Sequence, residues 1–149
     1  MPNTIRDLLK SRAHMDAATG AGTRMHARMA GIMIDDPTCR GDQELIDRIK
    51  SNPDLVKFFG PASRPEMPIA GYVNGRFISR RIDRIVIDNT ARRIMILDYK
   101  TDIDRDALRA KYCAQLREYR ALCRAIYTGY DVSCYILWTH DWRLENILK

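Results

Sequence analysis

The chain has 149 residues, of which 46% are hydrophobic and 30% are charged. This balance is typical of a globular domain with one core, and it excludes a disordered chain. The longest apolar run is far shorter than the roughly 20 residues that span a bilayer, so no membrane partner is expected. The formal net charge is +6, and arginine supplies most of the positive charge. Basicity of this kind suggests a partner that carries phosphate.

Residues 1–7 are charged and lack the apolar segment that directs export. We therefore expect a cytoplasmic protein whose four cysteines are reduced thiols. Cys113 and Cys123 form the only close pair, and they lie ten residues apart in a helical pattern. Zinc and iron–sulfur sites use tighter spacings, so these thiols are interpreted as structural.

Helix signals dominate the first part of the chain. Residues 1–19 are predicted to form a helical extension without a strong apolar stripe, and Gly20-Ala21-Gly22 interrupts it. Thr23 is a plausible N-cap for the next helix, and Asp36-Pro37 is expected to end that helix. Three helical segments and a loop are predicted there, over residues 24–34, 42–51, 53–59 and 60–65.

Strand patterns follow. Asn74-Gly75 is the strongest short hairpin signal, the two-residue type I′ turn. Pro68 places the strand before it at a sheet edge, because proline cannot donate to a ladder. Strands are predicted over residues 66–73, 76–88 and 93–99, followed by a helix over 104–127 and a strand over 132–138. This order indicates a single α/β domain with a mixed sheet, in which an antiparallel meander precedes a helix and a further strand.

The hairpin turn also predicts which residues face each other. Asn74-Gly75 places Glu66 opposite Asp83, and the next turn places Asp83 opposite Asp98, with Cβ atoms about 4.5–5.5 Å apart. Like charges at such positions destabilise a sheet, so a row of carboxylates suggests a bound hard cation, Mg²⁺ or Mn²⁺. A single β-bulge would move Glu66 or Asp83 to the other face.

Lys100 lies two residues beyond Asp98 and shares its face of the strand. Acidic residues on strands are usually solvated, and a lone Asp-x-Lys is most often of that kind. Asp83 and Asp98, however, lie inside apolar runs, which favours a functional site.

Asp83, followed on the next strand by Asp98-Tyr99-Lys100, resembles the PD-(D/E)xK nuclease motif. Residues 22–26, residues 66–69 and Gln115-x-x-x-Tyr119 match the same family in order. Over residues 20–142 the chain resembles the nuclease domain at the C-terminus of RecB/AddA helicase–nucleases, and AddA most closely. The resemblance implies a restriction-endonuclease-like core. It also implies a Mg²⁺- or Mn²⁺-dependent DNA nuclease that works in DNA-end processing or double-strand-break repair and recombination.

The resemblance also implies roles for single residues. The metal would be bound by His26, Asp83, Asp98 and the backbone carbonyl of Tyr99. The catalytic residues would be Lys100, Asp98, Asp83, Glu66, Gln115 and Tyr119. The expected DNA contacts are Arg80, Arg81, Arg84, Gln115 and Tyr119.

Several alternatives remain open at this stage. Arg80 stands where the family usually carries a small residue, so the site could be impaired and the fold kept for DNA binding. Arg117, Arg120 and Arg124 on the long helix would support such a binding module. The chain lacks a Walker A loop and hence a helicase motor, so it is a stand-alone nuclease, a piece separated from a motor, or a subunit that docks on a helicase. Only Cys134 follows the Gln115 helix, so no iron–sulfur cluster is expected.

Overall fold

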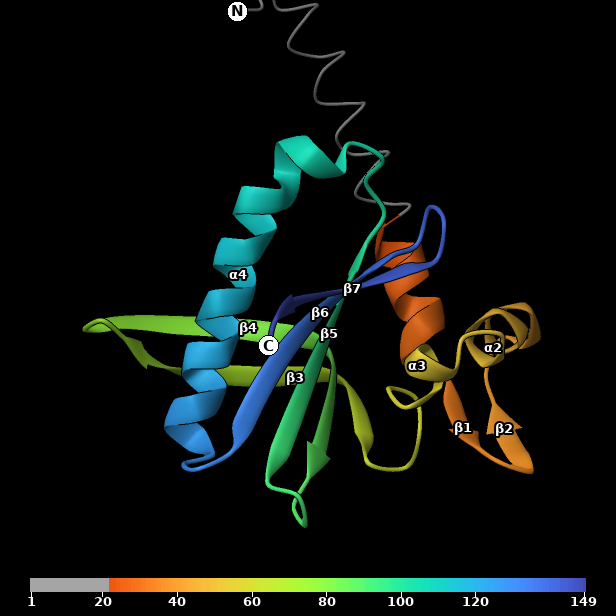
Figure 1. Cartoon of the computed structure of the whole chain (residues 1–149), viewed down its shortest axis with the longest axis horizontal. Coiled ribbons are helices and arrows are strands. Elements are labelled where there is room, and N and C mark those ends of the chain that lie inside the picture. The colour runs from red at the N-terminus through yellow and green to blue at the C-terminus, as the bar shows by residue number, and fades with distance from the viewer. Residues whose placement is uncertain (1–21) are drawn as a thin grey trace, which may run out of the picture.

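The structure, a computed structural model, describes residues 22–149. It is an α/β arrangement with a five-stranded mixed sheet, in the order β3-β4-β5-β6-β7, and a separate two-stranded ribbon, β1-β2 (Figure 1). The helical extension expected over residues 1–19 lies outside the described residues. Within the described part of the chain, no helix is long and apolar enough to cross a membrane.

The N-terminal elements differ from the prediction in one place. Residues 22–30 are helical, but the chain then forms β1 (Met33–Asp35) and β2 (Thr38–Arg40) instead of continuing as a helix to residue 34. The helical prediction was wrong there because Ile32 and Ile34 are buried at a spacing that also suits a strand. Thr23 lies within the helical residues, so the expected N-cap is also wrong.

The following two helices agree with the prediction. In α2 (Gln43–Lys50), the Asp42 side chain accepts a hydrogen bond from the backbone N–H of Leu45 at 3.2 Å, which satisfies a donor of the first turn. In α3 (Pro53–Val56), proline occupies the start of the helix, where its missing N–H costs nothing.

The sheet confirms the predicted hairpin and its register. β3 (Ser63–Val73) and β4 (Arg76–Asp88) pair from Val73↔Arg76 to Ser63↔Val86. Asn74 and Gly75 have φ values of 52° and 75°, as a type I′ turn requires. β3 begins earlier than expected, at Ser63, and forms one edge of the sheet.

The second half of the sheet is mixed. β5 (Arg93–Lys100) pairs antiparallel with β4 and parallel with β6 (Asp131–Trp138), and α4 (Arg105–Ile126) makes the crossover. A last strand that was not predicted, β7 (Arg143–Leu148), pairs antiparallel with β6 at the other edge.

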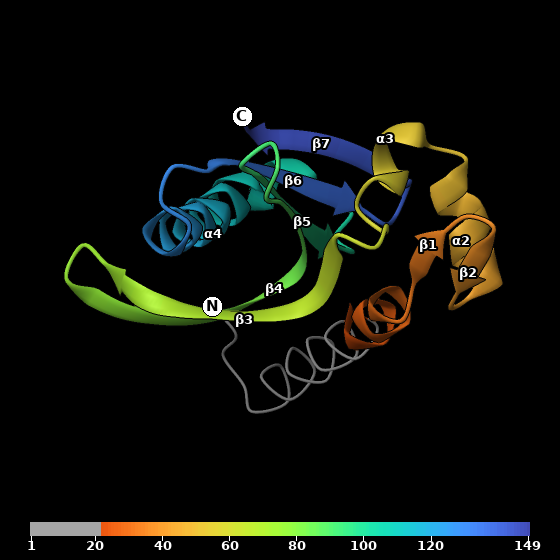
Figure 2. The same ribbon diagram turned by 90° about the horizontal axis from the view of Figure 1, so that it is seen from below.

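Two hydrophobic layers cover the two faces of the sheet (Figure 2). The α4 side buries Leu116, Leu122 and Cys123 of the helix against sheet residues. The other side packs the N-terminal helices against β5 and β6 through Leu97, Tyr99 and Leu137, among others. Ile126, at the C-terminal end of α4, is 52% exposed.

In β3 and β4, the regular alternation of side chains between the two faces of the sheet is interrupted at Glu66 and Asp83. Ile82 packs in the α4 layer, whereas Arg84, two residues later, contacts the N-terminal helix on the opposite side. Glu66 has a φ of 52°, and the β4–β5 ladder ends at Arg84↔Leu97. Both strands therefore turn at the same point, which keeps the register and separates β4 from the end of β5.

Candidate functional site

An open pocket of about 530 Å³ lies where β4 separates from the end of β5. Its walls come from the N-terminal helix, the middle of the β3–β4 hairpin, β5 and one face of α4. The lining residues are Gly22, Thr23, His26, Glu66, Arg81, Asp83, Asp98, Tyr99, Lys100, Thr101, Asp102, Tyr112, Gln115 and Tyr119. The pocket thus collects most of the residues that the sequence pattern singled out.

Asp98 is the buried carboxylate of the pocket. Its residue is 2% exposed, and Lys100 Nζ lies 2.7 Å from its Oδ2. Apart from this ion pair, Oδ2 has no hydrogen-bond partner among residues 22–149. Burial, together with the charge of Asp83, raises the pKa of Asp98 to about 7.

Asp83 is held between the N-terminal helix and β5. Its Oδ2 accepts a hydrogen bond from the backbone N–H of Tyr99 at 2.8 Å and lies 3.0 Å from His26 Nε2. The hydrogen bond to Asp83 raises the pKa of His26 to about 9. Nδ1 of His26 donates to the carbonyl of Gly22 at 2.6 Å, so Nε2 is the nitrogen that faces the carboxylates.

One face of α4 holds Lys100. Gln115 Oε1 accepts a hydrogen bond from Lys100 Nζ at 2.9 Å, and Gln115 Nε2 donates to the hydroxyl of Tyr119 at 2.8 Å. Gln115 and Tyr119 are one helical turn apart and therefore meet on the same face. The chain of contacts from Tyr119 to Lys100 to Asp98 links α4 to the end of β5.

The sequence reasoning missed Tyr112 and Asp102 as site residues. Lys100 Nζ lies 4.3 Å from the centre of the Tyr112 ring, and the Tyr112 hydroxyl donates a hydrogen bond to Asp102. A cation over an aromatic face is attracted by the ring electrons. Tyr112 lies three residues before Gln115, on the same helix face, and this spacing is the signal that could have identified it.

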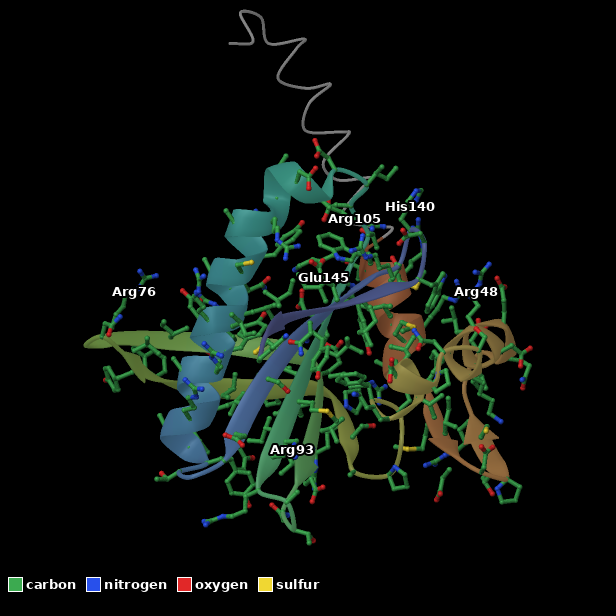
Figure 3. All side chains as sticks on the ribbon, in the orientation of Figure 1. Arg48, Arg76, Arg93, Arg105, His140 and Glu145 are labelled. Atoms are coloured by element: carbon green, nitrogen blue, oxygen red, sulfur yellow. The ribbon has the colours of Figure 1, made fainter. Side chains whose placement is uncertain are left out.

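Two ion pairs hold the start of α4 in place. Arg105 pairs with Asp141 in the β6–β7 turn, and Arg109 pairs with Glu145 of β7. Figure 3 shows Arg105 and Glu145 at this junction. The β6–β7 hairpin therefore supports the helix that carries Tyr112 and Gln115.

Glu66 and the two neighbouring arginines occupy different positions around the pocket. Glu66 lines the pocket but is not paired with Asp83 in the ladder, and its carboxylate lies 2.8 Å from Arg81 Nε. Arg81 is at the rim, with 70% of its side chain exposed. Arg80 faces α4, where its Nε donates to Glu118 at 3.2 Å, so it does not line the pocket.

Arg84 corrects one sequence-based expectation. It is fully buried, with 0% of its surface exposed, and therefore does not present its guanidinium to DNA. Its guanidinium donates to the Tyr99 hydroxyl at 3.1 Å and to the carbonyls of Met29 and Ile32 at 2.9 and 3.2 Å. Arg84 thus joins the C-terminal end of the N-terminal helix to the sheet.

The donor set fits a hard divalent cation. Asp83, Asp98 and the Tyr99 carbonyl offer oxygen atoms, which Mg²⁺ and Mn²⁺ prefer, and Asp98 Oδ2 is a buried oxygen without a hydrogen bond. The His26 ring is already oriented through Gly22, as ligating imidazoles commonly are. Within residues 22–149, however, no three His, Cys, Asp or Glu side chains form a ready-made metal cluster. His26 and Asp83 engage each other, and Lys100 engages Asp98, so these contacts have to rearrange when a cation binds.

No protein-family model matches this sequence, and no curated protein matches it. The function is therefore argued from the residues of the pocket.

Proposed function

We propose that this protein is a Mg²⁺- or Mn²⁺-dependent deoxyribonuclease of the PD-(D/E)xK type, built on a restriction-endonuclease-like core. It would hydrolyse phosphodiester bonds in DNA-end processing or double-strand-break repair, in the cytoplasm. One observation carries the proposal: two neighbouring carboxylates and one lysine meet in an open pocket, and one of the carboxylates is buried against the lysine. Buried charge of this kind is costly to the fold and is typical of functional sites.

Asp83, Asp98 and the Tyr99 carbonyl would hold the cation, with His26 beside them. When bound, the cation supplies an activated water and stabilises the charge that develops on the phosphate. Lys100 would place its ammonium group next to the same phosphate, where a fixed positive charge lowers the barrier. Gln115 and the Tyr112 ring contact the Lys100 side chain independently of Asp98, so they would keep it in the pocket when a cation takes its place at Asp98.

The surroundings of the pocket support an anionic polymer as substrate. Arg81 stands exposed at the rim, and the whole chain carries a net charge of +6. Phosphate neutralisation by such groups provides most of the affinity in nonspecific DNA binding. Tyr119 and Gln115 line the pocket opposite Asp83 and Asp98 and belong to the same proposed substrate channel.

A second candidate is a nuclease fold that binds DNA without cutting it. The observation that favours it is that both carboxylates are already engaged, Asp98 by Lys100 and Asp83 by His26. If these contacts do not give way to a cation, the protein still binds DNA but does not hydrolyse it.

A cleavage assay on labelled linear and circular DNA, with Mg²⁺ or Mn²⁺ and with chelator, tests the proposal. Wild-type protein should shorten the DNA only with the metal, and Lys100→Ala or Asp98→Ala should lower the rate by at least about 100-fold. Lys111→Ala is the matched control, because Lys111 is exposed on α4 and does not line the pocket, so its rate should equal that of wild type. A wild-type protein that shifts the DNA without shortening it would establish the binding module instead.

A further inference from the structure

The β3–β4 hairpin projects past α4 as an arm, defined here as residues 67–82 (Figure 1, Figure 2). The inner face of the arm packs on α4, where Ile69, Ile78 and Ile82 are buried. Strand alternation turns the intervening residues to the outer face. On that face Tyr72 is 72% exposed and Phe77 is 59% exposed.

These two aromatic residues form a pair at the tip of the arm. Tyr72 and Phe77 oppose each other in the ladder, and their ring centroids lie 5.5 Å apart in an edge-to-face arrangement. Exposed aromatic side chains in soluble proteins usually serve an interaction. Ring faces that are open to solvent are the surfaces on which unpaired bases of a nucleic acid stack.

The charge of the arm is of one sign. Residues 67–82 contain three arginines and no aspartate or glutamate. Arg76 stands at the far end of the arm, as Figure 3 shows, but it pairs with Val73 in the ladder and therefore shares the inner face with Ile78. Arg81 stands at the other end, where its side chain is 70% exposed and also pairs with Glu66, and Arg80 is paired with Glu118 on the inner side. An aromatic pair that shares its face with an exposed arginine complements a chain of bases and phosphates better than it complements an apolar protein surface.

The outer face leads directly into the pocket. The residues of this face share one side of the hairpin, and Arg81 at its end also lines the pocket. From Phe77 to Asp83 the strand advances about 20 Å, at about 3.3 Å for each residue. This length corresponds to about six stacked nucleotides at about 3.4 Å each. The opposed pairs along the face are Tyr72↔Phe77, Ala70↔Ser79 and Pro68↔Arg81.

We propose that the outer face of the arm binds a single-stranded DNA segment and directs it into the pocket. Bases stack on Tyr72 and Phe77, and Arg81 contacts the phosphates between the ring pair and the pocket. Base pairing hides the faces of bases in a duplex, so the aromatic pair selects an unpaired strand. This inference rests on the proposed function, because it names the form of DNA that reaches the carboxylates.

The test measures binding of fluorescent oligothymidylates of 4 and 12 nucleotides in chelator, by anisotropy, together with cleavage in Mn²⁺. Wild type should bind the 12-mer more tightly than the 4-mer, which is too short to reach from the pocket to the tip. The double variant Tyr72→Ala/Phe77→Ala should weaken binding of the 12-mer by at least about 25-fold, because two base stacks are lost and each contributes about 5-fold to 150-fold. The ratio of the two Kd values should then fall towards 1.

Two control variants separate stacking from general surface damage. Tyr72→Phe/Phe77→Tyr keeps both rings and should retain the affinity of wild type. Ile126→Ala removes an exposed apolar side chain on α4, away from the outer face, and should also leave the Kd unchanged.

Each result decides either the arm or the nuclease proposal. If the double variant binds the 12-mer as wild type does, the arm does not bind DNA, whatever the cleavage assay shows. If wild type instead self-associates in light scattering and the double variant does not, with equal DNA binding, the arm is a protein interface and the inference is wrong. If arm-dependent binding is present but no DNA is cut in Mn²⁺, the nuclease proposal fails and the arm site stands.

Discussion

Arg84→Met tests whether a buried arginine holds the N-terminal helix, and with it His26, against the sheet. The substitution keeps an apolar stem of similar length but removes the guanidinium. Four buried partners then lose a hydrogen bond: the Tyr99 hydroxyl, the Ser63 hydroxyl and the carbonyls of Met29 and Ile32. A buried polar group left without a partner costs about 1–3 kcal/mol. The packing of the guanidinium on the Phe59 ring, at 4.4 Å, is lost as well.

Four such losses at the lower limit of about 1 kcal/mol each, together with the lost ring contact, sum to about 5 kcal/mol. A domain of this size has about 5–15 kcal/mol of stability in all. With a urea m value of about 2 kcal/mol/M, the unfolding midpoint should fall by about 2–3 M. Arg84→Lys retains the charge and part of the donor set, so its midpoint should lie between wild type and Arg84→Met.

Urea unfolding followed by circular dichroism measures these shifts. Arg81→Met is the matched control, because it is the same substitution three residues away on a side chain that is 70% exposed. Its ion pair with Glu66 is at the surface, so the loss should stay below about 1 kcal/mol. Equal midpoints for Arg84→Met and Arg81→Met would refute the structural role of Arg84.

Three further predictions concern charge. In chelator, the contributions of His26 and Asp98 to stability should both decline as pH rises, because both pKa values are raised in the folded state. The Asp98 contribution is lost between its ordinary pKa of 3.8 and about 7, and the His26 contribution between 6.5 and about 9. The urea unfolding midpoint should therefore change less with pH in Asp98→Asn and His26→Gln than in wild type, each within its own pH window. An unchanged dependence of the midpoint on pH would contradict the prediction. Asp98→Asn should raise the melting temperature in chelator at neutral pH because it removes a buried carboxylate, whereas Asp83→Asn should lower it because His26 loses its charged partner. Both variants should lose most of the gain from millimolar Mn²⁺, since a ligand that binds only the folded state stabilises it. If both variants melt lower and keep the full Mn²⁺ response, the two carboxylates do not share a cation. Arg117, Arg120 and Arg124 form an arginine stripe on α4. Replacing all three by alanine should reduce the slope of log K for DNA binding against log salt concentration by about one unit for each lost phosphate contact. An unchanged slope would mean that the stripe is a solvated helix face.

Local sequence was sufficient for much of the sheet. The Asn74-Gly75 turn admits only residues that tolerate positive φ, so it placed the hairpin and its register without knowledge of the rest of the chain. The proline in β3 likewise predicted an edge strand, because its missing N–H excludes a central position. The helix predicted over residues 104–127 is likewise present as α4, because its apolar residues recur at helical spacing.

Other features depend on contacts between distant segments. The residues after Gly31 suit a helix or a strand locally, and pairing of Ile34 with Cys39 decides for the strand. β7 exists because β6 offers an unpaired edge, which no local pattern in residues 143–148 reveals.

The site shows the same division. The strand register set by the turns predicted from the sequence that Asp83 lies near Asp98, and the structure brings both into one pocket. Tertiary packing alone decided the direction of the arginines: Arg84 is drawn inward by the free carbonyls at a helix end, and Arg80 by Glu118. An arginine carries the same charge whether it is buried or at the surface. Only the position of its hydrogen-bond acceptors determines whether it holds the fold together or faces a ligand.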